Sequence, residues 1–390
     1  MTEKNKHIPQ GYKDSPLGII PKEWNVKKIL DFAPLQRGFD LPTDKIIVGK
    51  YPVVYSNGIL NYHDEYKANG PGVVTGRSGT IGKVTYVKSD YWPHNTSLWV
   101  TDFKGNNSKY VYYVYEYMGL SKFASGSGVP TLNRNDVHVS KVAIPPIEEQ
   151  KHIVEVLELW DTAIERQSEL IEKLKLRKRA LMQQLLKGKK RLPGFNRKWE
   201  HVPIRTFAKE VSNRNINGGN HIVLSCTKYD GLVPSLEYFG KQIFSNDLSS
   251  YKIIPQGHFA YATNHIEEGS IGYQSKFENG LISPMYTVFI TDKSKVNDRF
   301  LFAVLKSHRL IYLYKSMMEG SINRRGGLRW DSFSTIKIDL PPLNEQNAIA
   351  SLLIKADKEI GLANKMLAEF QNQKRGLMQQ LLTGKKRIEK

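Results

Sequence analysis

The sequence predicts an α+β protein in which two mixed α/β globular domains are separated by two long antiparallel coiled-coil helices, as an internal pseudo-two-fold repeat. One observation is that KRALMQQLLKGKKR at 178–191 returns as KRGLMQQLLTGKKR at 374–387, with twelve of fourteen positions identical. Each copy also ends a long segment of heptad spacing, and each segment follows a region rich in Gly, Tyr and β-branched residues. We predict the globular domains at 1–146 and 191–342, and the helices at 147–190 and 343–390.

The repeat extends well beyond its basic helix ends. The segment IPPIEEQKHIVEVLELWD at 144–161 aligns with LPPLNEQNAIASLLIKAD at 340–357, again at an offset of 196. Near the start of each unit, PKEWNVKKILDFA at 21–33 resembles NRKWEHVPIRTFA at 196–208, at an offset of 175. The turn GTIG at 79–82 matches GSIG at 269–272 at an offset of 190. The second unit is therefore longer, and most of its extra residues precede the Gly-rich turn.

The two long segments carry a narrow apolar stripe. Its positions advance by alternating fours and threes over more than four heptads, which favours helix packed against helix over two helices that each lie on their own domain. Gly188 and Gly384 stand where helix C-caps are expected. Lys178 and Lys374 fall on the stripe and either snorkel at its edge or help to set the register. The predicted seam residues are Ile153, Leu157, Trp160, Ile164, Ile171, Leu174, Leu181, Leu185, Ile349, Leu353, Ile360, Leu367, Phe370, Leu377 and Leu381.

The direction of the helices follows from the order of the segments. The ends of a compact domain usually lie close together. The end of the first helix and the start of the second should therefore be neighbours on either side of the second domain, and the helices should run antiparallel. From Ile153 to Leu185 a helix spans roughly 50 Å at about 1.5 Å per residue. We expect a dumbbell with approximate two-fold symmetry.

The sequence of each globular region predicts short strands and one helix. GVVTGRSGTIGKVTYV at 72–87 and LISPMYTVFI at 281–290 have the composition and turn signals of strands. SKYVYYVYEYMGLSKF at 108–123 and DRFLFAVLKSHRLIYLYKSM at 298–317 each predict one helix. The order of the strands does not follow from the sequence.

Composition indicates a polyanionic partner. The formal net charge is +19, from 57 Lys and Arg against 38 Asp and Glu, and nucleic acid is the commonest partner of such a chain. The single cysteine, Cys226, excludes an internal disulfide and is expected to be buried. The N-terminal residues have no apolar signal-peptide core, and no run of about eighteen apolar residues occurs, so we expect a cytoplasmic protein.

No catalytic motif survives inspection. GRSGTIGK at 76–83 lacks the spacing and the final Ser or Thr of a phosphate-binding loop. The Pro-Pro pairs follow Ile144 and Leu340, which lack the side-chain acceptor that precedes Pro-Pro in amino-methylating enzymes. We find no His/Glu metal spacing and no Gly-x-Ser-x-Gly elbow. We therefore predict no catalytic residues, no metal site and no enzymatic activity for this chain.

The chain resembles the specificity (S) subunit of type I restriction-modification systems. The resemblance rests on the openings at Trp24 and Trp199, the Pro-Pro-x-x-Glu-Gln segments at 145–150 and 341–346, the Gly-rich turns and the duplicated helices, and it covers essentially the whole chain. It implies two target recognition domains that each read one half of a bipartite DNA site, with helices acting as spacers that dock two modification subunits.

The resemblance also assigns the chemistry to partner subunits. It implies that this chain binds no cofactor. The partner methyltransferase holds S-adenosylmethionine and methylates an adenine in each half-site, whereas restriction subunits use ATP and Mg to move along and cleave double-stranded DNA. The expected rod length is about one and a half turns of B-DNA at roughly 34 Å per turn, which leaves an unread gap between the half-sites.

Candidate DNA-reading residues are turn residues with suitable hydrogen-bonding groups. Specificity requires polar side chains at base edges, whereas Lys and Arg on phosphates supply affinity. The stretches SGVPTLNRND from 127 and SINRRGGLRW from 321 hold corresponding places before the Pro-Pro pairs. The candidates are Asn57, Arg77, Ser78, Thr131, Asn133 and Arg134 in the first domain, and Asn264, His265, Asn323, Arg324, Arg325 and Arg329 in the second.

Three other readings stay open. A stand-alone sequence-specific DNA-binding protein, such as an orphan specificity subunit, would use the same scaffold. An enzyme without a recognisable motif would show activity as the pure chain. A structural coiled-coil protein would leave the charge and the two divergent domains unexplained.

Overall fold

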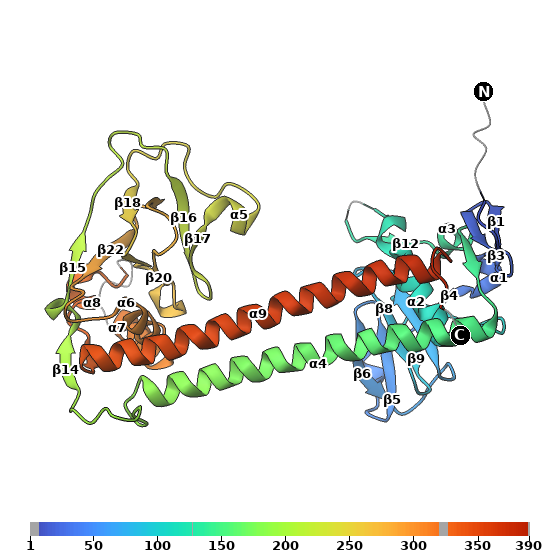
Figure 1. The fold of residues 1–390 in the computed structure, drawn as a ribbon, viewed down its shortest axis with the longest axis horizontal. Helices are drawn as coiled ribbons and strands as arrows, with labels where there is room; N and C mark the ends of the chain where they lie inside the picture. The colour runs from blue at the N-terminus through green and yellow to red at the C-terminus, as the bar shows by residue number, and fades with distance from the viewer. Residues whose placement is uncertain (1–7, 127, 320–326, 389–390) are drawn as a thin grey trace. The chain divides into compact units, whose positions relative to one another are not determined.

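The computed structural model describes residues 8–126, 128–319 and 327–388. The chain forms two compact units, the first made of residues 1–169 and 364–390 and the second of residues 170–363. Each unit therefore contains one globular region and one half of each long helix (Figure 1). None of the helices in the described part of the chain combines the length and the apolar composition that a membrane span requires.

The first unit is built around a four-stranded antiparallel sheet in the order β4-β10-β7-β8. Its strands are β4 (Leu35–Arg37), β7 (Gly72–Gly76), β8 (Val84–Val87) and β10 (Ser97–Val100), and β7 is buried along its whole length. Helix α2 (Ser108–Met118) packs on this sheet through Tyr110, Val111 and Val114. Asn107 caps the helix by accepting hydrogen bonds from the backbone of Lys109 and Tyr110 at 2.9 and 3.0 Å.

Smaller elements complete the first unit. A second sheet has the order β6-β5-β9, from β5 (Tyr51–Tyr55), β6 (Gly58–His63) and β9 (Trp92–Pro93). The remaining pairs are β1 (Tyr12–Ser15) with β2 (Gly18–Pro21), β3 (Asn25–Lys28) with β13 (Lys141–Ile144), and β11 (Ala124–Ser125) with β12 (Thr131–Leu132). The short helices are α1 (Ile29–Phe32), η1 (Thr43–Lys45), η2 (Leu120–Phe123) and α3 (Arg134–His138).

The second unit repeats the main sheet of the first. The order β15-β22-β19-β20 corresponds strand for strand to β4-β10-β7-β8. Its strands are β15 (Ala208–Val211), β19 (Phe259–Ala262), β20 (Ile271–Tyr273) and β22 (Tyr286–Thr291). The pair β14 (Glu200–Pro203) with β23 (Lys337–Leu340) likewise corresponds to β3 with β13. The sequence repeat is thus a structural repeat.

The two units differ in the layer beside this sheet. The second unit has a four-stranded sheet, β17-β16-β21-β18, where the first has only β6-β5-β9. Its strands are β16 (Ile222–Thr227), β17 (Gly231–Pro234), β18 (Lys252–Pro255) and β21 (Asn279–Ile282). Most of this layer lies between β15 and β19, before the Gly-rich turn at 269–272. The change in alignment offset between the two repeats placed the extra residues in that same interval. The short helices are η3 (Ile204–Thr206), α5 (Ser235–Phe239), η4 (Ile266–Glu268) and α8 (Trp330–Phe333).

The prediction of a single helix over 298–317 is wrong. The segment forms α6 (Asp298–Leu305) and α7 (His308–Glu319), with a break at Lys306 and Ser307. Ser307 begins the second helix, since its hydroxyl accepts from the Leu310 N–H at 3.4 Å and its carbonyl from the Ile311 N–H at 3.0 Å. A serine that satisfies the first N–H groups of a new helix competes with continuation of the old one.

The long helices α4 (Ile147–Leu185) and α9 (Leu343–Leu382) run antiparallel within each unit. In the first unit, the early half of α4 packs on the late half of α9, with Trp160 and Phe370 in an edge-to-face contact at 5.9 Å. In the second unit, Leu185 shares a core with Ile349 and Leu353. Figure 1 shows the two helices side by side. Every predicted seam residue is buried or half-buried.

The lysines on the seam are ion-paired. Lys374 is buried, and its ammonium lies 2.7 Å from Asp161 and 3.1 Å from Glu116. Lys178 pairs with Asp357 at the corresponding place in the second unit. The Lys374 ammonium thus lies between the carboxylate of Asp161 on α4 and that of Glu116 on α2, where the helix pair meets the globular domain.

Candidate nucleic-acid interface and helix anchors

Five of the first-domain candidates lie on two adjoining loops. Ser78 and Thr131 form an isolated antiparallel bridge, and the Leu132 N–H donates to the Arg77 carbonyl at 2.8 Å. Asn133 and Arg134 follow directly and are exposed. The Asn133 side chain accepts from the Asn135 N–H at 3.0 Å and so caps α3. Part of its hydrogen-bonding capacity is therefore used in the fold.

The sixth candidate, Asn57, lies on the turn between β5 and β6. It is exposed, and its carbonyl accepts from the Lys83 ammonium at 2.5 Å. Lys83 follows the GTIG turn, so this bond joins the Asn57 turn to the loop that begins at Arg77. The structure therefore brings all six candidates of the first domain to one group of loops.

Sequence reasoning missed a polar network beside this group. The Arg77 guanidinium donates to the Asn95 carbonyl at 3.3 Å, and the Asn95 amide donates to the Asp40 carboxylate. Arg37 also pairs with Asp40 at 3.1 Å. The Asn95 hydrogen bond, and then the charge of Arg37, lower the pKa of Asp40 against the opposing effect of burial. Asp40 and Asn95 are far apart in the chain and form no spaced motif, so only the fold could reveal this acceptor.

The second domain has a corresponding loop pair. The Leu328 N–H donates to the Thr263 carbonyl at 2.8 Å, as Leu132 does to Arg77 in the first domain. Gly327 has φ +64°, and a Cβ there would lie 2.4 Å from the Thr263 carbonyl oxygen, so this close approach requires glycine. The exposed Asn264 and His265 follow Thr263, and the exposed Arg329 occupies the N-cap position of α8. Asn323, Arg324 and Arg325 lie outside the described residues.

One acidic group stands beside His265. Within the described part of the chain, the side-chain ligand atoms of His265, Glu267 and Glu268 all lie within 4.8 Å of one another. The prediction of no metal spacing missed this group because the three residues meet through the short helix η4. An exposed group of this kind is common on protein surfaces and by itself assigns no metal.

Each unit anchors the segment after one long helix to the start of the other through a glutamate carboxylate, which is fully buried in the second unit and half-buried in the first. In the second unit, Glu345 is fully buried at the start of α9. It accepts two hydrogen bonds from the Arg191 guanidinium at 2.6 Å and one from the Trp199 indole at 3.1 Å. Such bidentate, charge-assisted bonds are short and strong. We call this set the Glu345 anchor.

The first unit repeats the arrangement with equivalent residues. Glu149 at the start of α4 accepts from the Trp24 indole at 3.0 Å and from the Arg387 guanidinium at 3.1 and 2.9 Å. Arg191 and Arg387 are the last residues of the two basic repeats. Each copy of the stretch thus supplies the cation of one anchor. We call this second set the Glu149 anchor.

The glutamine of each Pro-Pro-x-x-Glu-Gln segment joins a long helix to its globular domain. Buried Gln150 accepts from the Asn107 N–H at 2.9 Å and donates to the Pro145 carbonyl at 3.0 Å. Gln346 accepts from the Asn297 N–H and donates to the Pro341 carbonyl, both at 2.8 Å. Because Asn107 and Asn297 are the N-caps of α2 and α6, each globular domain is held at a defined place on its long helix.

We expect the stability of the first unit to fall as the pH drops below about 6.5. Burial, and then the nearby charge of Arg134, lower the pKa of His138 below its ordinary value of 6.5. The Leu35 N–H donates to its Nε2 at 2.9 Å, which requires the unprotonated nitrogen. The unfolded chain therefore binds the proton first, so the stability is fully present above the unfolded pKa and is lost below it.

Urea unfolding between pH 5 and 8 tests this. His138→Gln offers a neutral acceptor to Leu35 and should show a shallower pH dependence than the unchanged chain. Equal slopes for the two proteins would contradict the assignment, because other titrating groups, including His94 with its pKa lowered by burial, are common to both.

The fold defines a class of protein: two recognition domains of one design, with divergent outer layers, held on a pair of antiparallel helices. The family model described as "Type I restriction modification DNA specificity domain" matches the chain twice, over residues 21–176 and 205–372. These matches cover well over half of the chain, one for each repeat. The chain belongs to this family of DNA specificity proteins.

Individual relatives agree with the family. The chain is 25% identical to the type I restriction enzyme MjaVIII specificity subunit of Methanocaldococcus jannaschii, over 95% of this chain and 94% of that protein. The crystal structure of a type I restriction-modification system S subunit from M. genitalium has a TM-score of 0.57 at 15% identity and covers 92% of this chain and 96% of its own. A chain solved in work on complex assembly and conformational transition of the type I R-M system has a TM-score of 0.55 at 14% identity, covering 94% and 99%. The two structures support the fold.

Proposed function

We propose that this chain is the non-catalytic DNA sequence-recognition subunit of a type I restriction-modification complex. Each globular domain reads one half of an asymmetric bipartite target. The paired helices dock two methyltransferase subunits, which carry S-adenosylmethionine and methylate adenine in each half-site, and restriction subunits add cleavage that uses ATP and Mg. The observation that carries the proposal is the repeated sheet with a different outer layer in each unit.

The repeated parts and the divergent parts suit different partners. The main sheet, the anchors and the helices recur with equivalent residues, so they offer two matching surfaces to two copies of one partner. The outer layers β6-β5-β9 and β17-β16-β21-β18 differ in strand number and order, so the surfaces that they support differ too. Two different surfaces fit two different half-sites. The excess of positive charge supports binding to DNA phosphates.

A genome-wide map of adenine methylation tests the proposal. Cells that express this chain with the methyltransferase encoded beside it are compared with cells that express the methyltransferase alone. We expect a new bipartite, asymmetric motif only when this chain is present. If both proteins associate and no motif appears, the recognition role in methylation is wrong and a stand-alone DNA-binding protein becomes the better account.

A domain exchange then assigns the half-sites. The first globular domain is replaced by that of another family member, and the second is replaced in a separate variant. Each exchange should change one half of the motif and leave the other half and the gap unchanged. A change in both halves after a single exchange would contradict independent reading by the two domains.

A further inference from the structure

The C-terminal ends of helices α2 and α6 differ between the two units in a way that bears on recognition. The GTIG and GSIG turns correspond at an offset of 190, and so do the N-caps Asn107 and Asn297, which makes Glu116 and Lys306 equivalent positions. Glu116 faces the long helices and pairs with Lys374 at 3.1 Å. Lys306 faces the globular domain instead.

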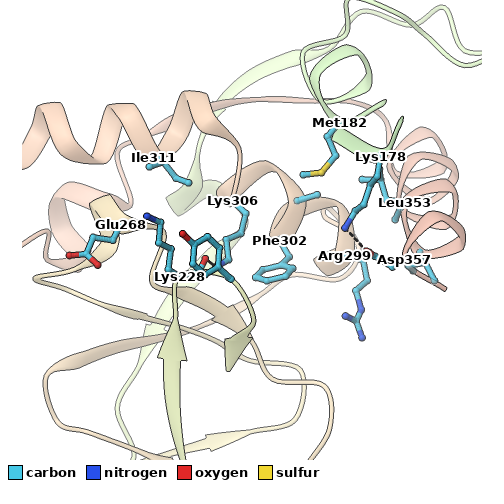
Figure 2. A pocket seen from close by; sticks show the side chains of 14 residues that line it. Lys178, Met182, Lys228, Glu268, Arg299, Phe302, Lys306, Ile311, Leu353 and Asp357 are labelled. Carbon is cyan, nitrogen blue, oxygen red and sulfur yellow. Dashed lines mark hydrogen bonds and ion pairs between the residues drawn. The ribbon is translucent and has the colours of Figure 1, made fainter. Parts of the chain in front are cut away.

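The Lys306 ammonium is held by three backbone carbonyl groups. It donates to the carbonyls of Thr227 at 3.2 Å, Lys228 at 2.8 Å and Gly269 at 2.7 Å. Figure 2 shows Lys306 near Lys228, and both are among the residues that line a pocket of about 420 Å³ in the second unit. Burial of the side chain lowers the pKa of Lys306. An ammonium has three donors, and here each of them has an acceptor.

These carbonyls belong to two turns. Thr227 and Lys228 begin the turn between β16 and β17, in the outer layer that the first unit builds differently. Gly269 ends the turn that starts at Asn264 and His265, both candidate DNA-reading residues. Gly269 has φ +92°. Ile311 of α7 lies close to it, since the Ile311 Cδ1 would be 3.3 Å from a Cβ added at Gly269. The turn therefore packs against α7. Lys306 therefore joins the outer layer and the Asn264 turn to the end of one helix.

The other end of that helix is tied to α9. The Asn297 N–H donates to Gln346, and the Asn297 amide donates to Asn347, both at 2.8 Å. Helix α6 thus connects the long helix to the loops on which the second domain is expected to read DNA. In the first unit, both ends of α2 contact the long helices, through Gln150 and through Lys374, so the position equivalent to Lys306 is engaged by a long helix instead of by loop carbonyls.

We propose that Lys306 is a positioning residue that sets the sequence specificity of the second recognition domain by holding its outer-layer turn and its Asn264 turn in register with α6. This rests on the proposed function, because it concerns how one of the two half-sites is read. Lys306 itself contacts no base in this scheme. It acts through the two turns whose carbonyl groups it holds.

The test is a methylation map of the full chain with its methyltransferase, made for Lys306→Met and for the matched variant Glu116→Gln. The second half-site is the one that the exchange of the second domain alters. Lys306→Met should lower the preference for the correct bases in that half roughly ten-fold, about the effect of one mismatched base pair, and leave the first half unchanged. Glu116→Gln should leave both halves unchanged.

The outcomes separate this inference from the proposed function. No motif with the unchanged chain overturns the proposed function itself. If the unchanged chain and Lys306→Met give the same methylation motif, with the same base preference in the second half, the positioning role is overturned. If Lys306→Met is not recovered with the methyltransferase, Lys306→Gln takes its place, since its amide can still donate to two of the three carbonyls. Loss of both half-sites together with Lys306→Gln would show a general structural role and would also overturn the inference.

Discussion

Replacement of Glu345 by leucine is expected to destabilise the second unit by about 3 kcal/mol, the lower end of the range for removal of one partner from a buried ion pair. Glu345 is fully buried and accepts from both Arg191 and Trp199. Its loss leaves the Trp199 indole N–H without its acceptor, and leaves a guanidinium that is 27% exposed and can partly rehydrate. The rehydration keeps the effect from reaching the upper end of the range.

Urea unfolding followed by hydrogen exchange with mass spectrometry measures the effect and locates it. The increase in exchange should appear at the start of α9 and in the segment that carries Trp199. The matched control is Glu149→Leu in the first unit, where the glutamate is 11% exposed and Arg387 is 39% exposed. We expect a smaller loss there. Equal losses for the two variants would mean that burial of the carboxylate does not govern the strength of an anchor.

The second large effect is expected at Gly384, in the turn that follows α9. Its φ is +68°, and a Cβ there would lie 2.4 Å from Cδ of Pro21. Gly384→Ala therefore combines the strain of a left-handed backbone, about 1 kcal/mol or more, with overpacking of about 1–3 kcal/mol. We expect a total loss of about 2–5 kcal/mol from the first unit.

The repeat supplies the matched control for this variant. Gly188 follows α4 at the corresponding position with φ +62°, but the atoms nearest to a Cβ there belong to the Trp199 ring at 3.5 Å, which is an ordinary contact. Gly188→Ala should therefore cost only the backbone strain, about 1–2 kcal/mol. Thermal unfolding of the two variants makes the comparison. A loss at Gly188 as large as that at Gly384 would show that the contact with Pro21 is relieved by a small shift.

Much of the architecture could be predicted from the sequence because its signals are local or repeated. Heptad spacing predicts a helix wherever it occurs, and a second copy in the same order predicts a second unit of the same design. Antiparallel pairing followed from chain order and the closeness of domain ends. The error at α6 and α7 also has a local cause, since Ser307 can cap a new helix without interrupting the apolar periodicity on either side.

The candidate interface was predictable only in part. Turn residues with donors, such as Arg77 and Thr131, could be identified because loops carry most binding groups. Asp40 was missed because its partner, Asn95, comes from a different loop. Nothing local predicts that the ammonium of Lys306 meets carbonyls of two turns, at 227–228 and at 269, that are about 40 positions apart in the chain.

The sequence by itself determined that this protein has two related units, two long paired helices and a formal net charge of +19. Periodicity, repetition and charge are properties of the chain that need no contacts to be recognised. Only the tertiary structure decided which glutamate accepts hydrogen bonds from which arginine and tryptophan. It also decided how the outer layers differ and which loops lie together. Those features depend on contacts between residues far apart in the chain, such as Arg191 and Glu345 at a separation of 154, which local sequence patterns do not encode.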